Sequence, residues 1–457
     1  MKIKCTICNA LVLLLLCSCV VCFGASEPAQ DDAIGIVLDI LRSGDQEMQA
    51  VAIAMVKEMS GTEVTEALAK ELPKLSAASQ VMLLSALSDR GDAAALPAVS
   101  AAAKSKNPSV RIAALRALGQ LGGASSIELL AQAAASATGE ERKAARDSLY
   151  RLRGPDVDQV ILATIPKAEP KMKVELIDAV GERNVHTGVS VLLKTAKDSD
   201  RKVRIQSLRV LKVVAGPVDM PALVELLINA QSSSDRNEAQ KTIAAVAHKI
   251  EDENRQAEAV LIVLPKVKPI PSRCSLLSVL GKIGDNTALP VLTAALKEKN
   301  TEVQTAAIRA LAEWPTPKPL ADLLKVAESS ANKVHRILAL RGFVRLLGLE
   351  NERSADELLD MYKKAMSLAP DTGEKRRVLS GLGNVQSLAA LTMAAGYLDD
   401  KSLSREASSA AVKIASDICD KFPKEANDVL KKIITQTKET DPLRVQAQEV
   451  IDKIKQP

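Results

Sequence analysis

The sequence predicts an all-α fold, an α-solenoid of about thirteen stacked helix pairs. Apolar residues make up 47% of the 457 residues but aromatic residues only 2%, so Ala, Leu, Val and Ile must fill the interior. Apolar positions recur at spacings of three and four residues, the period of an amphipathic helix. The same pattern returns about every 31 residues, which is the signature of a stacked repeat protein.

Residues 1–25 have the layout of a secretory signal peptide, with a basic start, an apolar run and small residues at the end. Cleavage after Gly24 suits an ordinary signal peptidase. The run "LCSC" at 16–19 also resembles a bacterial lipobox, in which Cys19 would carry a lipid. Both routes predict export to the periplasm or the outside of the cell, and an uncleaved N-terminal anchor is a third alternative. Contact with a membrane is expected only through the N-terminus.

Charge and cysteine content exclude several classes of function. The formal net charge is +5, and without Lys2 and Lys4 of the leader it is +3 (5 − 2), which is too mild to indicate a nucleic-acid partner. Five of the seven cysteines lie in the leader, which leaves Cys274 and Cys419. Without a CxxC pair or a Cys/His cluster, neither a zinc site nor a disulfide framework is expected.

The repeat can be followed from one position in each unit, taking Arg116 as the reference. Steps of 31 residues, which lengthen slightly after residue 209, place it in thirteen similar segments. The equivalent residues are Ala54, Ser85, Arg116, Asp147, Asp178, Arg209, Lys241, Ser278, Arg309, Arg341, Ser380, Ser409 and Glu449. This series fixes the register of the repeat.

A second position, five residues earlier, supports this register. It is basic in nine of the thirteen units, where chance would give fewer than two because 61 of 457 residues are Lys or Arg. The residues are Gln49, Gln80, Arg111, Arg142, Lys173, Arg204, Arg236, Arg273, Gln304, Arg336, Lys375, Ser404 and Arg444. An amphipathic segment precedes each such position, and Asp, Asn, Gly or Pro separates the two. Each unit is therefore predicted to be helix A, a turn and helix B.

The segments "NPSVRIAALRALGQLGG", "DSDRKVRIQSLRVLKVVAG" and "KNTEVQTAAIRALAEWP" resemble HEAT repeats of the short bacterial type. The resemblance covers nearly all of residues 26–455 and implies one continuous array, a right-handed superhelix whose B helices line a concave inner surface. Residues from about 422 to 455 are expected to cap it, because a terminal unit needs one polar face. Gln49, Gln80 and Gln304 depart from the basic signature.

The pattern also predicts how the units hold together. Small residues of helix B should let neighbouring helices approach closely, so a large residue at Ala113 or Ala114 should force units apart. The basic residues that open helix B, such as Arg111 and Arg204, should meet turn residues such as Asn107 and Asp200.

No catalytic constellation is visible in the sequence. The three histidines, His186, His248 and His335, have no carboxylate or second histidine at metal-binding spacing. We therefore expect no enzyme activity, cofactor or metal.

The candidate binding residues lie at the reference position. Arg116, Arg209, Lys241, Arg309 and Arg341 could form a discontinuous basic ridge on helix B that suits acidic protein or glycan surfaces, although a solvated face of ordinary charge is the alternative. The segment 313–347 adds Trp314 and His335, and Trp and Arg often dominate interfaces. Trp314 alternatively covers the core between two units.

These observations favour a non-catalytic scaffold that binds an unidentified protein partner in the cell envelope or outside the cell. The partner's binding surface could be acidic. Two alternatives come from other classes. HEAT-like repeats also occur in bilin lyases, so an accessory or lyase-like subunit of an enzyme is the first. A HEAT-like protein that grips a nucleic-acid backbone is the second.

Overall fold

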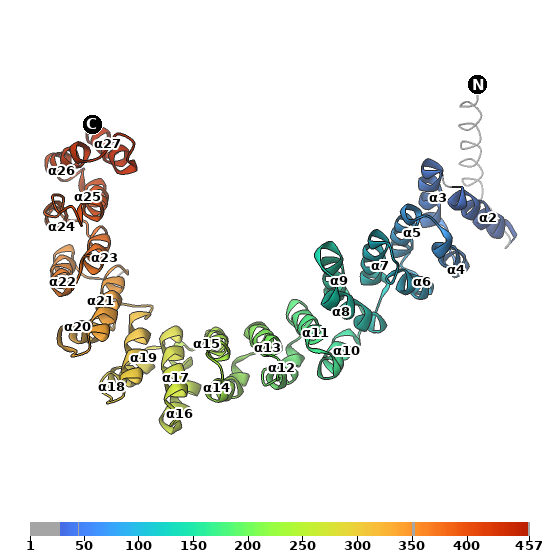
Figure 1. Cartoon of the computed structure of the whole chain (residues 1–457), viewed down its shortest axis with the longest axis horizontal. Helices are drawn as coiled ribbons and strands as arrows, with labels where there is room; N and C mark the ends of the chain where they lie inside the picture. Colours follow the sequence, from blue (N-terminus) through green and yellow to red (C-terminus); the bar gives the residue numbers. More distant parts are fainter. Residues whose placement is uncertain (1–27, 44, 350–351, 456–457) are drawn as a thin grey trace. The chain divides into compact units, whose positions relative to one another are not determined.

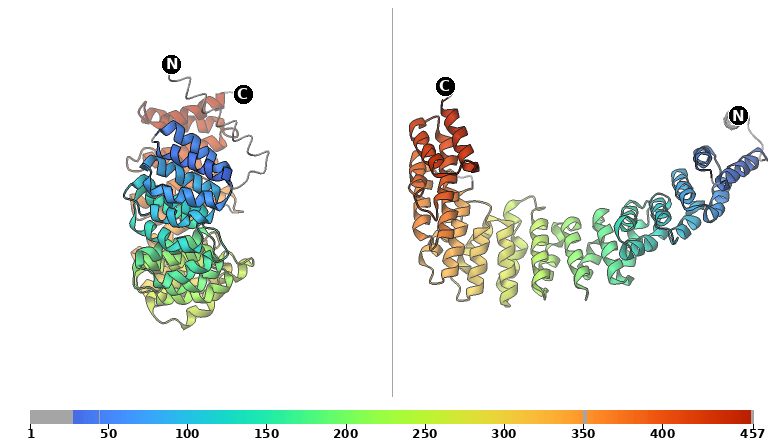
Figure 2. Two further views of the ribbon diagram at one scale, coloured as in Figure 1. Left: turned by 90° about the vertical axis from the view of Figure 1, so that its right-hand side faces the viewer. Right: turned by 45° about the horizontal axis from the view of Figure 1, so that its top comes forward.

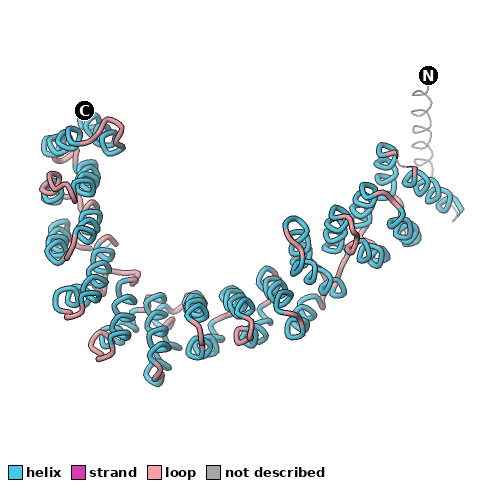
Figure 3. Tube along the Cα trace, in the orientation of Figure 1, coloured by secondary structure: helices cyan, strands magenta, loops and turns pink. Residues whose placement is uncertain are grey.

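The computed structural model describes residues 28–43, 45–349 and 352–455. In these ranges the regular structure consists of helices joined by turns, and none of it is strand (Figure 3). The 26 α-helices described, α2 to α27, form thirteen successive pairs, which confirms the predicted all-α fold. The leader, with Cys19, lies outside the described residues.

The first compact unit extends to Val214 and its described part holds six helix pairs. The first helices of these pairs are α2 (Pro28–Arg42), α4 (Thr62–Glu71), α6 (Leu96–Ala102), α8 (Ile127–Ser136), α10 (Val157–Thr164) and α12 (Val189–Thr195). The second helices are α3 (Gln46–Glu58), α5 (Ala77–Arg90), α7 (Pro108–Leu121), α9 (Gly139–Arg151), α11 (Pro170–Glu182) and α13 (Arg201–Val214).

The second compact unit begins at Ala215 and its described part holds seven pairs. The first helices are α14 (Met220–Asn229), α16 (Glu258–Val263), α18 (Leu289–Ala295), α20 (Leu320–Ser329), α22 (Ala355–Leu368), α24 (Leu388–Ala395) and α26 (Pro423–Gln436). The second helices are α15 (Ser233–Ala247), α17 (Ile270–Ile283), α19 (Thr301–Ala312), α21 (Lys333–Leu347), α23 (Thr372–Leu382), α25 (Ser404–Ile418) and α27 (Pro442–Lys455).

Short 3-10 segments adjoin many of the first helices. They are η1 (Leu72–Lys74), η2 (Ala93–Ala95), η3 (Ala124–Ser126), η4 (Ile165–Lys167), η5 (His186–Gly188), η6 (Pro217–Asp219), η7 (Glu253–Arg255), η8 (Leu264–Lys266) and η9 (Asn286–Ala288). Several carry a proline in their first positions, where the missing N–H has no helical partner to lose.

Within each unit the helices form two layers (Figures 1 and 2). The odd-numbered helices pack against one another in succession and make up the layer that we call the B layer. The even-numbered helices make up the A layer, and the B helices also pack against their own A helices, except that α5 contacts η1, which follows α4. Because each pair packs against the pairs next to it, the apolar core continues between the two layers from one pair to the next.

The turns between A and B helices end in the N-caps that the sequence predicts. Asn107 Oδ1 accepts hydrogen bonds from the backbone N–H groups of Ser109 and Val110, which opens α7. Asn300 caps α19 in the same way, through Glu302 and Val303. These side chains satisfy donors that the first turn of a helix leaves without partners.

Small residues bring neighbouring B helices into close contact, as predicted. A Cβ atom on Gly281 of α17 would lie 2.6 Å from Ala310 Cα of α19. A Cβ on Gly119 of α7 would lie 2.7 Å from Ser148 Oγ of α9. Ala114 of α7 is also fully buried. The B layer is therefore spaced by residues that have little or no side chain.

Candidate functional site

The five basic residues at the reference position all lie on the exposed side of B helices. Arg116 is on α7 and Arg209 on α13 of the first unit, while Lys241, Arg309 and Arg341 are on α15, α19 and α21 of the second. The sequence register thus puts these side chains on an outward face of the B layer.

Two of these side chains make loose ion pairs at the surface. Arg116 Nη2 lies 3.6 Å from Glu140 Oε2, and Lys241 Nζ lies 3.5 Å from Glu238 Oε2. Exposed pairs of this kind contribute only about 0–1 kcal/mol to stability. A partner could displace them at little cost, so both cations are accessible to an acidic surface.

Arg341 is more firmly held. Its Nη2 and Nε donate to Glu374 Oε1 of α23 at 2.5 and 2.9 Å, and Glu374 is only 4% exposed. These hydrogen bonds raise the pKa of Arg341 above its usual value. The Arg341 side chain as a whole remains 46% exposed. Arg341 therefore neutralises a buried carboxylate and still presents donors to the outside.

The structure buries the other two candidates. Trp314 is 0% exposed and His335 only 3% exposed, so neither offers the binding surface that the sequence predicted for the patch at 313–347. Trp314 follows α19 in a turn whose Pro315 packs where a Cβ on Gly284, the C-cap of α17, would stand. His335 Nε2 lies 2.9 Å from Thr305 Oγ1, and burial lowers its pKa. The burial matches the alternative reading of Trp314 as a cover for the core.

Lys173 meets a turn aspartate as predicted, with its Nζ 2.9 Å from Asp198 Oδ2, but Arg111 does not use the predicted Asn107. Arg111 Nη1 donates to the carbonyls of Ser105 and Lys106 at 3.0 and 3.1 Å, and its Nε and Nη2 donate to Glu141 of the next B helix. Asn107 caps its own helix instead. Arg204, Arg236 and Arg336 likewise donate from Nη1 to carbonyls five and six residues earlier. The signature arginine therefore closes the turn after helix A.

A second set of contacts was missed at the sequence level. Arginines near the ends of B helices reach back to the carbonyls that end the preceding B helix. Arg90 Nη1 donates to Val56 O at 2.6 Å, Arg183 Nη1 to Leu152 O at 2.8 Å, and Arg345 Nε to Ala312 O at 2.7 Å. These arginines stand four or five residues after the reference position, a recurrence that was available in the sequence.

A compact charged cluster joins α9, α11 and α13 of the first unit. Glu175 accepts from Arg142 Nη2 at 2.6 Å and from Arg146 Nε at 2.5 Å. Asp178 accepts from Gln206 Nε2, and its Oδ2 lies 3.6 Å from Arg146 Nη2. Asp178 is 21% exposed, and burial raises its pKa to about 6. The charged form of this carboxyl is thus disfavoured in the folded state.

Replacing Asp178 with asparagine is expected to stabilise the fold at pH 7 by about 1–3 kcal/mol. Between its usual pKa of 3.8 and about 6, the folded state binds more protons at Asp178 than the unfolded chain does. Stability from this group therefore falls as pH rises through that window, and the gain from Asp178→Asn should vanish near pH 4. Urea denaturation at pH 7 and pH 4, with Asp147→Asn on α9 as control, measures it. A loss of stability at pH 7 would contradict the assignment.

No group of three or more His, Cys, Asp or Glu side chains within the described ranges is arranged to hold a metal ion. Cys274 and Cys419 are both free thiols. Of the helices described, none combines the length and the apolar character that crossing a bilayer requires.

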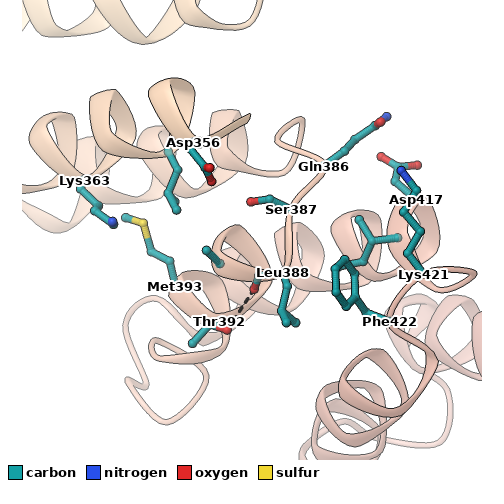
Figure 4. Close-up of a pocket in the computed structure, with 13 residues that line it drawn as sticks. Asp356, Lys363, Gln386, Ser387, Leu388, Thr392, Met393, Asp417, Lys421 and Phe422 are labelled. Carbon is teal, nitrogen blue, oxygen red and sulfur yellow. Dashed lines mark hydrogen bonds between the residues drawn. The ribbon is translucent and has the colours of Figure 1, made fainter. Parts of the chain in front are cut away.

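Two of the hollows in the second unit lie where a partner could insert a side chain. One, of about 880 Å³, lies between α22, the start of α24 and the end of α25 (Figure 4). Its apolar floor includes Leu388 and Phe422, and its rim carries Asp356, Asp417, Lys363 and Lys421. The other, of about 340 Å³, lies between α21 and α23 of the B layer and contains Arg341.

Stacked helix pairs in two layers, with a regular row of exposed positions on one of them, define the chain as an α-solenoid. The family model of HEAT repeats matches residues 65–149 and 269–343, so these parts of both units are HEAT repeats. No curated protein matches the chain in sequence.

Solved structures share this fold at low sequence identity. Kap121p bound to Nup53p matches with a TM-score of 0.57 and 12% identity, over 93% of this chain and 53% of that chain. Kap121p bound to Ste12p matches with a TM-score of 0.56 and 13% identity, over 92% and 53%. A homology model of the AP-3 complex matches with a TM-score of 0.51 and 13% identity, over 93% and 90%. The chain thus spans about half the length of the Kap121p chains, and the likeness concerns the fold alone.

Proposed function

We propose that this chain is a non-catalytic scaffold that binds a protein partner along the exposed face of its B layer. The observation that carries the proposal is a discontinuous set of exposed basic side chains at the same position of several repeats: Arg116 and Arg209 in one unit, Lys241, Arg309 and Arg341 in the other. Side chains repeated at a fixed spacing can add many weak contacts to one large surface, and their sign favours an acidic partner. The Kap121p structures, which hold Nup53p and Ste12p, support the proposal by example.

The proposal is tested by capture of a partner with two matched double variants of the full chain. Lys241→Gln with Arg309→Gln removes two charges from the B layer, and Lys325→Gln with Lys431→Gln removes two exposed charges from the A layer. We expect the B-layer variant to lose most of the partner that the wild type retains, while the A-layer variant keeps it. Circular dichroism should show equal helicity in all three proteins. Equal retention by both variants would contradict binding on the B layer.

We further propose that the scaffold works in the cell envelope or outside the cell. The leader at 1–25 supports export, and the "LCSC" run at 16–19 supports a lipid on Cys19 as one of its two routes. The intact mass of the mature protein distinguishes them, because simple cleavage after Gly24 adds nothing, whereas the lipoprotein route leaves a chain that begins at a lipidated Cys19. A full-length mass with Met1 retained would contradict processing by either route.

A further inference from the structure

Two glycines are among the residues that line the hollow between α21 and α23. Gly348 follows α21 and Gly381 lies in α23, and both line the hollow. A Cβ on Gly381 would lie 2.8 Å from Tyr362 Cε1 of α22, so the backbone of this glycine packs directly against the buried Tyr362 ring. Side chains from both helices form the walls around these gaps. The result is an open groove of about 340 Å³ on the B layer.

Positive charge predominates in this groove. Arg341, Arg345 and Arg377 line it together with a single carboxylate, that of Glu374. Arg345 is engaged by the carbonyls of Ala312 and Trp314. Arg377 is 60% exposed and its Nε lies 3.7 Å from Glu374 Oε2, beyond hydrogen-bonding distance. The guanidinium of Arg377 thus faces the groove without a strong partner, beside the exposed donors of Arg341.

Two other places with comparable groups are balanced in charge. In the cluster between α9 and α11, Arg142 and Arg146 are matched by Glu175 and Asp178. The rim of the larger hollow in Figure 4 carries two aspartates and two lysines. An anionic group would gain little at either place. The groove between α21 and α23 differs because three guanidinium groups share one carboxylate.

We propose that this groove binds a carboxylate side chain on an acidic segment of the protein partner. Arg377 supplies a planar fork that can bind a carboxylate through two parallel N–H···O bonds, and Arg341 supplies the neighbouring positive charge. The hydroxyl of Ser380, which also lines the groove, is a further donor. Glu374 contacts both arginines and holds them on the same side of the groove. This inference rests on the proposed scaffold function and names the partner's chemistry at one site.

The test uses the full chain and two labelled decapeptides, one rich in glutamate and one with glutamine in the same positions. We expect the glutamate peptide to bind, and Arg377→Gln to weaken its binding about fivefold, with a larger loss for Arg377→Glu. Arg377 is chosen because Arg341, the main partner of the buried Glu374, would remain in place. Lys325→Gln on α20 of the A layer is the control and should leave binding unchanged. Fluorescence anisotropy at 50 and 200 mM salt measures each affinity.

Several outcomes would overturn the groove as a carboxylate site. These are no binding of the glutamate peptide, equal losses for Arg377→Gln and Lys325→Gln, or binding of inorganic phosphate by calorimetry with no binding of the peptide. None of them decides the scaffold proposal, because its capture test changes Lys241 and Arg309, which lie outside the groove. Conversely, failure of the capture experiment with intact peptide binding would overturn the scaffold and leave an acidic-peptide site.

Discussion

Substitution of Trp314 by alanine is expected to lower the free energy of unfolding of the second unit by about 3–5 kcal/mol. Trp314 is the single tryptophan of the chain and is completely buried in the turn after α19. Its loss would leave a cavity that the adjoining backbone cannot fill, because Pro315 is held against Gly284 and Arg345 holds the carbonyl of Trp314. Urea denaturation followed by circular dichroism measures the loss, and hydrogen exchange should place it in α17, α19 and α21.

The matched control is Trp314→Phe. The indole Nε1 is buried and has no hydrogen-bond partner, so phenylalanine removes volume without breaking a bond. The phenylalanine variant should therefore lose clearly less stability than the alanine variant. If Trp314→Ala instead keeps the stability of the wild type and loses partner binding, the side chain acts at a surface, as the sequence alone predicted.

The helix pairs and their register were predictable because the signals for them are local. A turn residue such as Asn107 caps the helix that begins directly after it, and the apolar spacing of that helix then fixes which side faces the core. The outward position of Arg116 and Arg309 follows from the same spacing. The repeat also supports the helix assignment within each unit, because every unit must bury its apolar face against a similar neighbour.

The contacts between units were less predictable because they join residues about 30 positions apart. Nothing local indicates that Arg111 pairs with Glu141, or that Arg345 reaches the carbonyl of Ala312. The burial of Trp314 depends on how the turn after α19 folds back onto the end of α17. Composition singled out Trp314 as unusual, and an unusual aromatic residue fits both a core and an interface.

Replacement of Gly281 by valine is expected to lower the free energy of unfolding by about 1–3 kcal/mol. Even the first atom of the new side chain would lie 2.6 Å from Ala310 Cα and 2.9 Å from Ala310 O. Both atoms belong to the backbone of α19, so no change of side-chain rotamer can make room. The helices α17 and α19 must separate, and the stacking of each on its neighbours weakens with them. Urea denaturation followed by circular dichroism measures the loss.

Gly35→Ala separates this packing effect from the general effect of removing a helical glycine. Gly35 lies within α2, and no atom stands within 4 Å of the place its Cβ would take. There the substitution should stabilise the helix by about 0.5–1 kcal/mol, because alanine has less backbone freedom to lose on folding. Gly281→Ala should gain the same stabilisation from reduced backbone freedom. Its net change in the free energy of unfolding should nevertheless be less favourable than that of Gly35→Ala, because its methyl group meets α19. Equal gains at both positions would mean that α17 and α19 can adjust their spacing freely, and that small residues do not set the distance between B helices.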